Sequence, residues 1–152
     1  GREMDLWNGG CHVHARFSEE ALLQLKLQYP AAKVLAHPEC KPSILQHSEA
    51  IGSTQALLNY AIAHTDEQRF IVATESGILH EMQKACPKVE FIPVPPTMEN
   101  ATPSACNECE YMRMNTLEKL YECLRNESNE IFVDEQVAKD AIMPIQRMLE
   151  MS

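Results

Sequence analysis

The sequence predicts an α/β domain in which a short parallel sheet is covered by helices on both faces. Short apolar runs alternate with segments of helical periodicity, in the order strand, helix, strand, helix, strand. Polar residues directly follow three consecutive apolar runs: His37, Glu39, Ser53, Thr54, Thr74 and Glu75. Parallel α/β sheets bind ligands at the carboxyl ends of their strands, so this placement predicts a site at that edge.

The first expected elements are a helix and a strand near the start of the chain. Ser18 can cap the helix, Glu19 and Glu20 lie in its first turn, where the helix dipole favours acids, and Pro30 lies just past its end. The apolar run 34–36 predicts a buried strand that ends near His37.

The later elements are expected from the same two patterns. Strands are predicted at 49–51, 70–73, 89–94 and 130–134, and helices at 54–65, 78–86, 115–126 and 135–151. Asn115 with Glu118 resembles a capping box, Pro87 stops a helix, and Pro144 predicts a break or kink. Residues 95–112 are rich in Pro, Ser, Thr and Asn, and they predict a long functional loop.

Composition excludes several classes of protein. The chain has 152 residues, enough for one domain with a real core, and its net charge is −9. No basic run offers a surface for nucleic acid, and no apolar run of about 18 residues predicts a membrane span. The first ten residues carry no apolar signal region, so the six cysteines are expected as reduced thiols or metal ligands in the cytoplasm.

The stretch CHVHARF, residues 11–17, has the composition of part of a metal site. In an extended segment, His12 and His14 would point to the same side and could hold one zinc ion. Alternatively, Cys11 is the ligand and a histidine serves the substrate. The third interpretation is a buried cysteine beside two ordinary surface histidines.

The stretch AHPEC, residues 36–40, predicts an acid–base pair at a strand end. Pro38 favours extended geometry for His37, so His37 and Glu39 could project together and exchange protons with a substrate. Cys40 could add a third metal ligand. The alternative is a turn with solvated side chains.

Two further short motifs have both a chemical and a structural interpretation. Ser53 and Thr54 start a helix whose free amides suit an anion, although a plain helix cap has the same sequence. Cys106 and Cys109 form a C-x-x-C pair that could bind a metal, form a redox disulfide, or do neither.

Taken together, these motifs resemble the quinolinate synthase family over essentially all 152 residues. The matching pieces are W-x-GGCHVH, AHPEC, IGST, ATESG, CNECEYMRMNTLEKL and PIQRML, in the family's order. The resemblance implies an α/β/α domain that is one of three around a pseudo-threefold axis. It also implies a [4Fe–4S] cluster whose open iron acts as a Lewis acid. The reaction implied is the condensation of iminoaspartate with dihydroxyacetone phosphate to quinolinate, in NAD biosynthesis.

The resemblance also assigns roles to positions of this sequence. Cys11 matches the second cluster cysteine and Cys109 the third, whereas Cys106 is a companion position. The matching substrate contacts are His37, Pro38, Glu39, Ser53 and Thr54. Glu39 and His37 are the expected acid–base residues, and His14 matches a histidine close to the cluster.

The resemblance leads us to expect a C-terminal portion of a longer enzyme. Residues 1–14 would end a second domain, 15–110 would form a third with the cluster loop, and 111–152 would pack on the first. The first domain would supply the third cysteine, so this portion alone is expected to be inactive. A plastid location would apply if the source were a plant or alga.

Two other functions fit parts of the sequence. A zinc-dependent hydrolase could use His12, His14 and His37, with Asp134 as a late ligand. A non-enzymatic redox module could be built on Cys106 and Cys109, although a thioredoxin-like pair should open a helix directly after a strand. Metal content separates the three candidate functions. A quinolinate synthase would contain iron with sulfide, a hydrolase of this kind would contain zinc, and the redox module would contain no metal.

Overall fold

The structure is a computed structural model, and it describes residues 3, 9–97 and 107–151. The chain divides into two compact units, Gly1–Glu110 and Tyr111–Ser152, each described by itself below. The strands of the first unit are β1 (Lys33–Ala36), β2 (Ala50–Ile51), β3 (Arg69–Ala73) and β4 (Glu90–Pro93). Its helices are α1 (His12–Ala15), α2 (Glu19–Gln28), α3 (Pro42–Leu45), α4 (Thr54–Ala63) and α5 (Ile78–Ala85).

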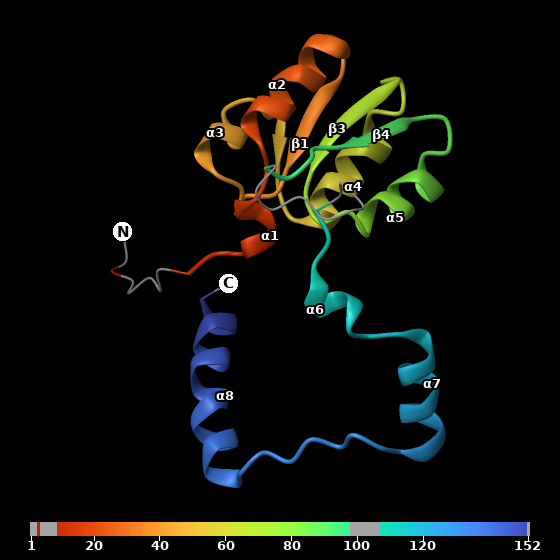
Figure 1. The fold of residues 1–152 in the computed structure, drawn as a ribbon. Helices are drawn as coiled ribbons and strands as arrows, with labels where there is room; N and C mark the ends of the chain where they lie inside the picture. The colour runs from red at the N-terminus through yellow and green to blue at the C-terminus, as the bar shows by residue number, and fades with distance from the viewer. Residues whose placement is uncertain (1–2, 4–8, 98–106, 152) are drawn as a thin grey trace. The chain divides into compact units, whose positions relative to one another are not determined.

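The four strands form one parallel sheet in the order β2-β1-β3-β4 (Figure 1). Strand β1 pairs with β2 and with β3, and β3 pairs with β4, always in parallel. In the register, Ala36 lies opposite both Ile51 and Ala73. The carboxyl ends of β1, β2 and β3 therefore meet at one edge, as the sequence predicted.

Helices cover both faces of the sheet and make a three-layer α/β/α arrangement (Figure 1). Alternate residues of β1 and β3 face opposite sides, because successive side chains along a strand do so. On one face the core comprises Phe17, Leu22, Val34, Ala36, Ile44 and Ile71, which packs α2 and α3. On the other face it comprises Leu35, Leu57, Ala61, Phe70, Val72 and Met82, which packs α4 and α5. The predicted fold class is confirmed.

Two predicted helix starts are also confirmed. The side chain of Ser18 accepts a hydrogen bond from the backbone N–H of Ala21, at the start of α2. The side chain of Ser53 accepts one from Ala56 at the start of α4. Each hydroxyl satisfies one of the amides that the first helical turn leaves without a partner.

The second unit is helical, and here two predictions are wrong. Helices α7 (Leu117–Asn126) and α8 (Glu135–Glu150) form where expected, but the predicted strand at 130–134 does not. A strand needs a hydrogen-bonded neighbour, and local apolar composition does not supply one. The expected capping residue Asn115 is replaced by its neighbour Thr116, whose side chain accepts from the N–H of Lys119.

Three further observations concern the helices of the described residues. Of the break or kink that the sequence predicted at Pro144, the break does not occur, because helix α8 runs through this residue, although proline removes one backbone donor from the helix. Helix α6 (Glu110–Arg113) is a single turn that begins with the last residue of the first unit. Among the described residues, no helix is long and apolar enough to cross a bilayer.

Candidate functional site

The candidate site lies at the carboxyl edge of the sheet, where three segments deliver polar side chains. His37 and Glu39 follow β1, Thr74 and Glu75 follow β3, and α1 brings in His14. The segment 11–17 is helical from His12 to Ala15, not extended, so the two histidines of CHVH diverge. A helical turn separates residues two apart by roughly 200°, whereas a strand would align them.

Two imidazoles and one carboxylate form the centre of the site. The rings of His14 and His37 are stacked, with centroids 4.1 Å apart and planes inclined by 8°. One carboxylate oxygen of Glu39, Oε2, lies 3.3 Å from Nδ1 of His14 and 3.5 Å from Nδ1 of His37. The backbone N–H of Glu39 donates to Nδ1 of His37 at 3.3 Å. The predicted partnership of His37 with Glu39 is therefore present, and it includes His14.

His14 is the buried member of this group. It is 7% exposed, and its Nε2 is hydrogen-bonded to the hydroxyl of Thr74 at 3.1 Å. Burial lowers the pKa of His14, and the nearby His37 lowers it further, against the raising effect of Glu39. Its Nδ1 is buried without an aligned hydrogen-bond partner among the described residues, despite its approach to Glu39. Burial and the neighbouring His37 thus favour the neutral form of His14, whose Nδ1 faces Glu39.

Cys11 joins His14 and Glu39 in a potential metal-binding group. The sulfur of Cys11, one ring nitrogen of His14 and one oxygen of Glu39 all lie within 4.8 Å of one another. Cys11 is half-buried and forms no disulfide. It precedes α1 directly, and its carbonyl accepts from the N–H of Ala15 at 3.0 Å. The helical turn therefore places Cys11 and His14 on a common side.

Cys40, considered from the sequence as a third ligand, belongs to the core instead. It is 4% exposed, and its thiol donates to the carbonyl of Ala73 at 3.3 Å. Burial raises the pKa of Cys40 to about 12, so the thiol keeps its proton at neutral pH. Metals bind the thiolate form, so Cys40 is a poor ligand where it stands.

The carboxylate of Glu75 positions Cys109. The sequence predicted that Glu75 lies at the carboxyl edge but did not indicate this role. The buried Glu75 accepts hydrogen bonds from the backbone N–H of Gly77 at 2.7 Å and of Cys109 at 3.3 Å. Glu75 therefore attaches the loop that carries Cys109 to the end of β3. The thiol of Cys109 is half-buried and free, but it is not a member of the group with Cys11.

Asn107 is a structural residue that sequence reasoning missed. It is 4% exposed, and its side-chain amide donates to the carbonyl of Val13 at 3.1 Å. Its own carbonyl accepts from the N–H of Ser76 at 3.1 Å. Asn107 thus connects the Cys109 loop both to α1 and to the end of β3. Its position between Cys106 and Cys109 was the one feature of the sequence that could have pointed to this role.

Two other predicted features lie apart from this group. His12 contacts Glu110 at 3.1 Å and is not a member of the potential metal-binding group. Ser53 is exposed and caps α4, and none of the described hydrogen bonds joins it or Thr54 to His14. Cys106 lies outside the described residues, so the C-x-x-C pair is not tested.

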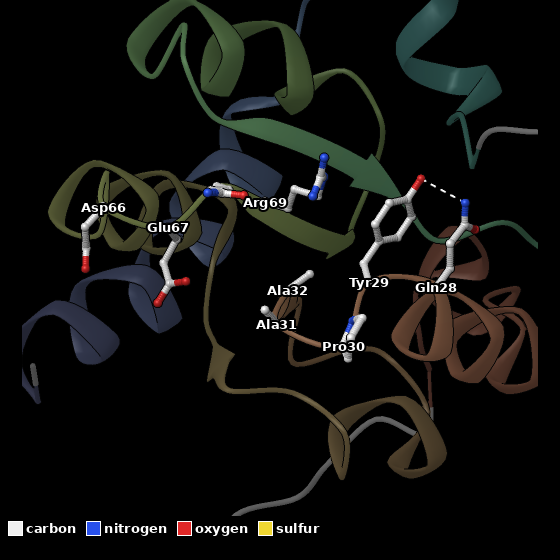
Figure 2. A pocket seen from close by; sticks show the side chains of 9 residues that line it. Gln28, Tyr29, Pro30, Ala31, Ala32, Asp66, Glu67 and Arg69 are labelled. Carbon is white, nitrogen blue, oxygen red and sulfur yellow. Dashed lines mark hydrogen bonds between the residues drawn. The ribbon is translucent and has the colours of Figure 1, made fainter.

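A second hollow opens at the opposite, amino edge of the sheet, with a volume of about 370 Å³ (Figure 2). Two of the charged residues that line it, Glu67 and Arg69, form ion pairs. The guanidinium of Arg69 pairs with Glu90 and lies over the ring of Tyr29, 5.3 Å from its centroid, and Lys33 pairs with Glu67. This hollow has room for a ligand, but the stacked imidazoles and the potential metal-binding group lie at the carboxyl edge.

Comparison with known proteins decides the family. A family model described as Quinolinate synthetase A protein matches residues 1–150. The chain belongs to this family. It is 55% identical over 152 residues to a quinolinate synthase of Chloroherpeton thalassium, and 54% identical to one of Microcystis aeruginosa. A quinolinate synthase of Synechocystis sp. is 53% identical over the same 152 residues.

The chain spans about half the length of the curated relatives it matches, namely 46% of each of these three. Membership of the quinolinate synthetase family bears out the resemblance found in the sequence. The zinc-hydrolase alternative is not supported, because His12 contacts Glu110 rather than sharing a centre with His14 and His37.

Proposed function

We propose that this chain is the part of a quinolinate synthase that carries the second and third cluster cysteines and the principal acid–base group. The activity would be the condensation of iminoaspartate with dihydroxyacetone phosphate to quinolinate. The observation that carries the proposal is the convergence of Cys11, His14, His37 and Glu39 at the carboxyl edge of the sheet, in a member of this family.

The thiols of the chain fit a [4Fe–4S] cluster. Such clusters are held by cysteine thiolates, and Cys11 and Cys109 are free, half-buried thiols in segments that Asn107 joins. Cys40 does not compete, because its buried thiol stays protonated. Cys11 and Cys109 would hold the cluster, and the third cysteine would come from another part of the enzyme. When bound, the cluster would supply a Lewis-acidic iron.

The protein's own contribution is the handling of protons. The reaction we propose releases water and phosphate, so protons must reach leaving oxygens and leave carbon and nitrogen. Glu39 is exposed enough to meet a substrate, with 48% of its side chain accessible, and Oε2 lies beside Nδ1 of both imidazoles. A proton taken up by Oε2 of Glu39 can be shared with Nδ1 of His14, 3.3 Å away. General acid–base catalysis of this kind typically contributes about 10²–10⁴-fold.

Binding of the anionic substrate groups would involve a neighbouring strand end. We assign Ser53, Thr54 and the first amides of α4 to an anionic group of the substrate, and His37, Pro38 and Glu39 to iminoaspartate. Helix α4 has ten residues, and its N-terminus lies at the carboxyl end of β2, beside β1. Free amides and the helix dipole favour an anion at this position.

The domain organisation is part of the same proposal. Residues 15–110 would be the third α/β domain, 1–14 the end of the second, and 111–152 a segment that packs on the first. Helices α7 and α8 expose many large apolar side chains, including Leu117, Leu120, Leu124, Ile145 and Leu149. Exposed apolar surface of this kind is typical of a docking face.

The experiment is an assay of the full-length, cluster-loaded enzyme with both substrates. We expect quinolinate to form only when iminoaspartate and dihydroxyacetone phosphate are both present, with one phosphate released per quinolinate. Mass spectrometry of the product and a phosphate assay measure the two quantities. Absence of quinolinate from enzyme that contains a full cluster would contradict the proposed function.

A further inference from the structure

We propose that Cys11, His14 and Glu39 form a site for a single zinc-class cation in the apo protein, and that this cation and an iron–sulfur cluster exclude each other. The cation site depends only on the three side chains. The mutual exclusion rests on the proposed function, because it requires Cys11 to be a cluster ligand.

The three donors are those that zinc selects, and they are already close together. Zinc binds cysteine sulfur, histidine nitrogen and carboxylate oxygen, and three protein ligands with an open fourth position are common. The donor atoms of Cys11, His14 and Glu39 lie within 4.8 Å of one another. Nδ1 of His14 and Oε2 of Glu39 are 3.3 Å apart. Two donors of a tetrahedral zinc ion, at bond lengths of about 2.0–2.1 Å, are about 3.4 Å apart.

The hydrogen bonding of His14 leaves one nitrogen available to the cation. Nε2 is paired with the hydroxyl of Thr74, and the imidazole is more than nine-tenths buried. With Nε2–H donating to Thr74, Nδ1 carries a lone pair, and it is one of two buried side-chain atoms without a hydrogen-bond partner among the described residues, the other being Oγ of Ser76. A zinc-ligating histidine usually donates its other N–H to such an outer acceptor, which fixes its tautomer.

The surroundings of Glu39 also favour a cation. Oε2 of Glu39 faces Nδ1 of His14 at 3.3 Å and Nδ1 of His37 at 3.5 Å. Nδ1 of His37 already accepts the backbone N–H of Glu39, so its lone pair is directed to that amide. A carboxylate oxygen beside two acceptor nitrogens is repelled unless positive charge lies between them. A cation bound to Oε2 and to Nδ1 of His14 removes this repulsion.

The competition with the cluster follows from the shared thiolate. Cation binding displaces the thiol proton of Cys11 to solvent and leaves a metal–sulfur bond. The same sulfur cannot then ligate a cluster iron. Cys109 is not a member of the cation group, whereas Glu39 is not a proposed cluster ligand. The two states therefore depend on different residues, apart from Cys11.

The test is a titration of the metal-free, reduced protein with Co²⁺ as a spectroscopic probe, followed by displacement with Zn²⁺. We expect one Co²⁺ per chain, a thiolate-to-cobalt charge-transfer band, and visible bands with the intensity of tetrahedral coordination. C11S should remove the charge-transfer band. E39Q and H14Q should each weaken binding by roughly tenfold or more, because even the loss of an outer partner costs 10–100-fold. C109S is the matched control and should bind as wild type does.

The variants keep the proposal falsifiable and separate it from the proposed function. Glu39 is exposed, so E39Q should fold even if H14Q does not, and circular dichroism checks each variant. Unchanged Co²⁺ binding in E39Q, or the same charge-transfer band in C11S, would overturn the cation site. Preloaded Zn²⁺ should block cluster reconstitution, and a full cluster formed with zinc retained would overturn the mutual exclusion. Loss of the cluster in C109S with Co²⁺ binding intact would support both proposals.

Discussion

The two edges of the sheet contrast in how their polar groups are satisfied. At the amino edge, Arg69 pairs with Glu90 and Lys33 with Glu67, around a hollow of about 370 Å³ (Figure 2). At the carboxyl edge, Glu39 meets two imidazole nitrogens, and Nδ1 of His14 has no aligned partner among the described residues.

The difference shows that volume is a poor guide to the site in this fold. The two ion pairs at the amino edge are partly exposed, so they contribute modestly to stability. The carboxyl edge contains converging groups that are incompletely satisfied by the chain itself. Unsatisfied buried polar atoms are costly, and they commonly mark sites that a ligand or metal completes.

The largest expected contrast is in turnover. In the full-length, cluster-loaded enzyme, Glu39→Gln should lower kcat by roughly 10²-fold or more, because it removes a proton acceptor from the acid–base group. Glu90→Gln, the same chemical change at the amino edge, should alter kcat by less than about twofold. Steady-state assays with iron content checked in each variant make the comparison. Near-normal turnover in Glu39→Gln would remove this carboxylate from the mechanism.

The next contrast is in stability. Glu75→Ala leaves the backbone amides of Gly77 and Cys109 without their carboxylate, and hydrogen bonds to charged groups contribute about 1.5–3 kcal/mol. We expect the free energy of unfolding to fall by about 2 kcal/mol, measured by urea denaturation. Glu67→Ala, which breaks a partly exposed pair with Lys33, should lower the free energy of unfolding less than Glu75→Ala does. Equal losses in the two variants would mean that Glu75 does not position the Cys109 loop.

The sequence predicted the fold of the first unit well because its signals were local. Val34 to Ala36 specified a buried strand, and Ser18 and Ser53 specified helix starts. The meeting of the polar residues at one edge was also predictable, since parallel strands end together. The strand expected at 130–134 was wrong because pairing depends on a distant partner that composition does not reveal.

The composition of the site was only partly predictable. The pairing of His37 with Glu39 could be predicted because only Pro38 lies between them in the sequence. The divergence of His12 from His14 could not be predicted, because CHVH suits a strand and a helical turn equally. The role of Asn107 depends on a contact with Val13, 94 residues away in the chain. No local pattern specifies a contact of that range.

A third contrast is between Cys40, which is buried in the core, and Cys11, which is half-buried at the candidate site. Burial raises the pKa of Cys40 to about 12, whereas the unfolded thiol titrates near 9.0. Between these values the unfolded state loses the proton and the folded state keeps it. The free energy of unfolding should therefore fall as pH rises above 9, by up to about 1.4 kcal/mol per pH unit.

Cys40→Ala provides the comparison for this pH dependence. Its unfolding free energy, measured by urea denaturation from pH 8 to 10, should fall less steeply than that of the wild type. Iodoacetamide at neutral pH should alkylate the half-buried Cys11 well before Cys40 in the folded, metal-free protein. Equally rapid alkylation of both thiols would contradict the placement of Cys40 in the core.

The smallest expected effect is at the amino edge. Arg69→Gln removes a half-exposed ion pair with Glu90 and a contact with the ring of Tyr29. We expect thermal unfolding to show a loss of about 1 kcal/mol or less, with no change in metal content. A large loss of cluster or of activity in Arg69→Gln would mean that the two edges are not functionally distinct.

The central claim, that Cys11 and Cys109 are the two cluster ligands from this chain, has one direct test. The full-length enzyme and its Cys109→Ser and Cys106→Ser variants are reconstituted anaerobically with iron and sulfide, then compared by iron and sulfide counting and by EPR. The account predicts a full cluster in Cys106→Ser and none that is stable in Cys109→Ser. A full, stable cluster in Cys109→Ser would contradict it.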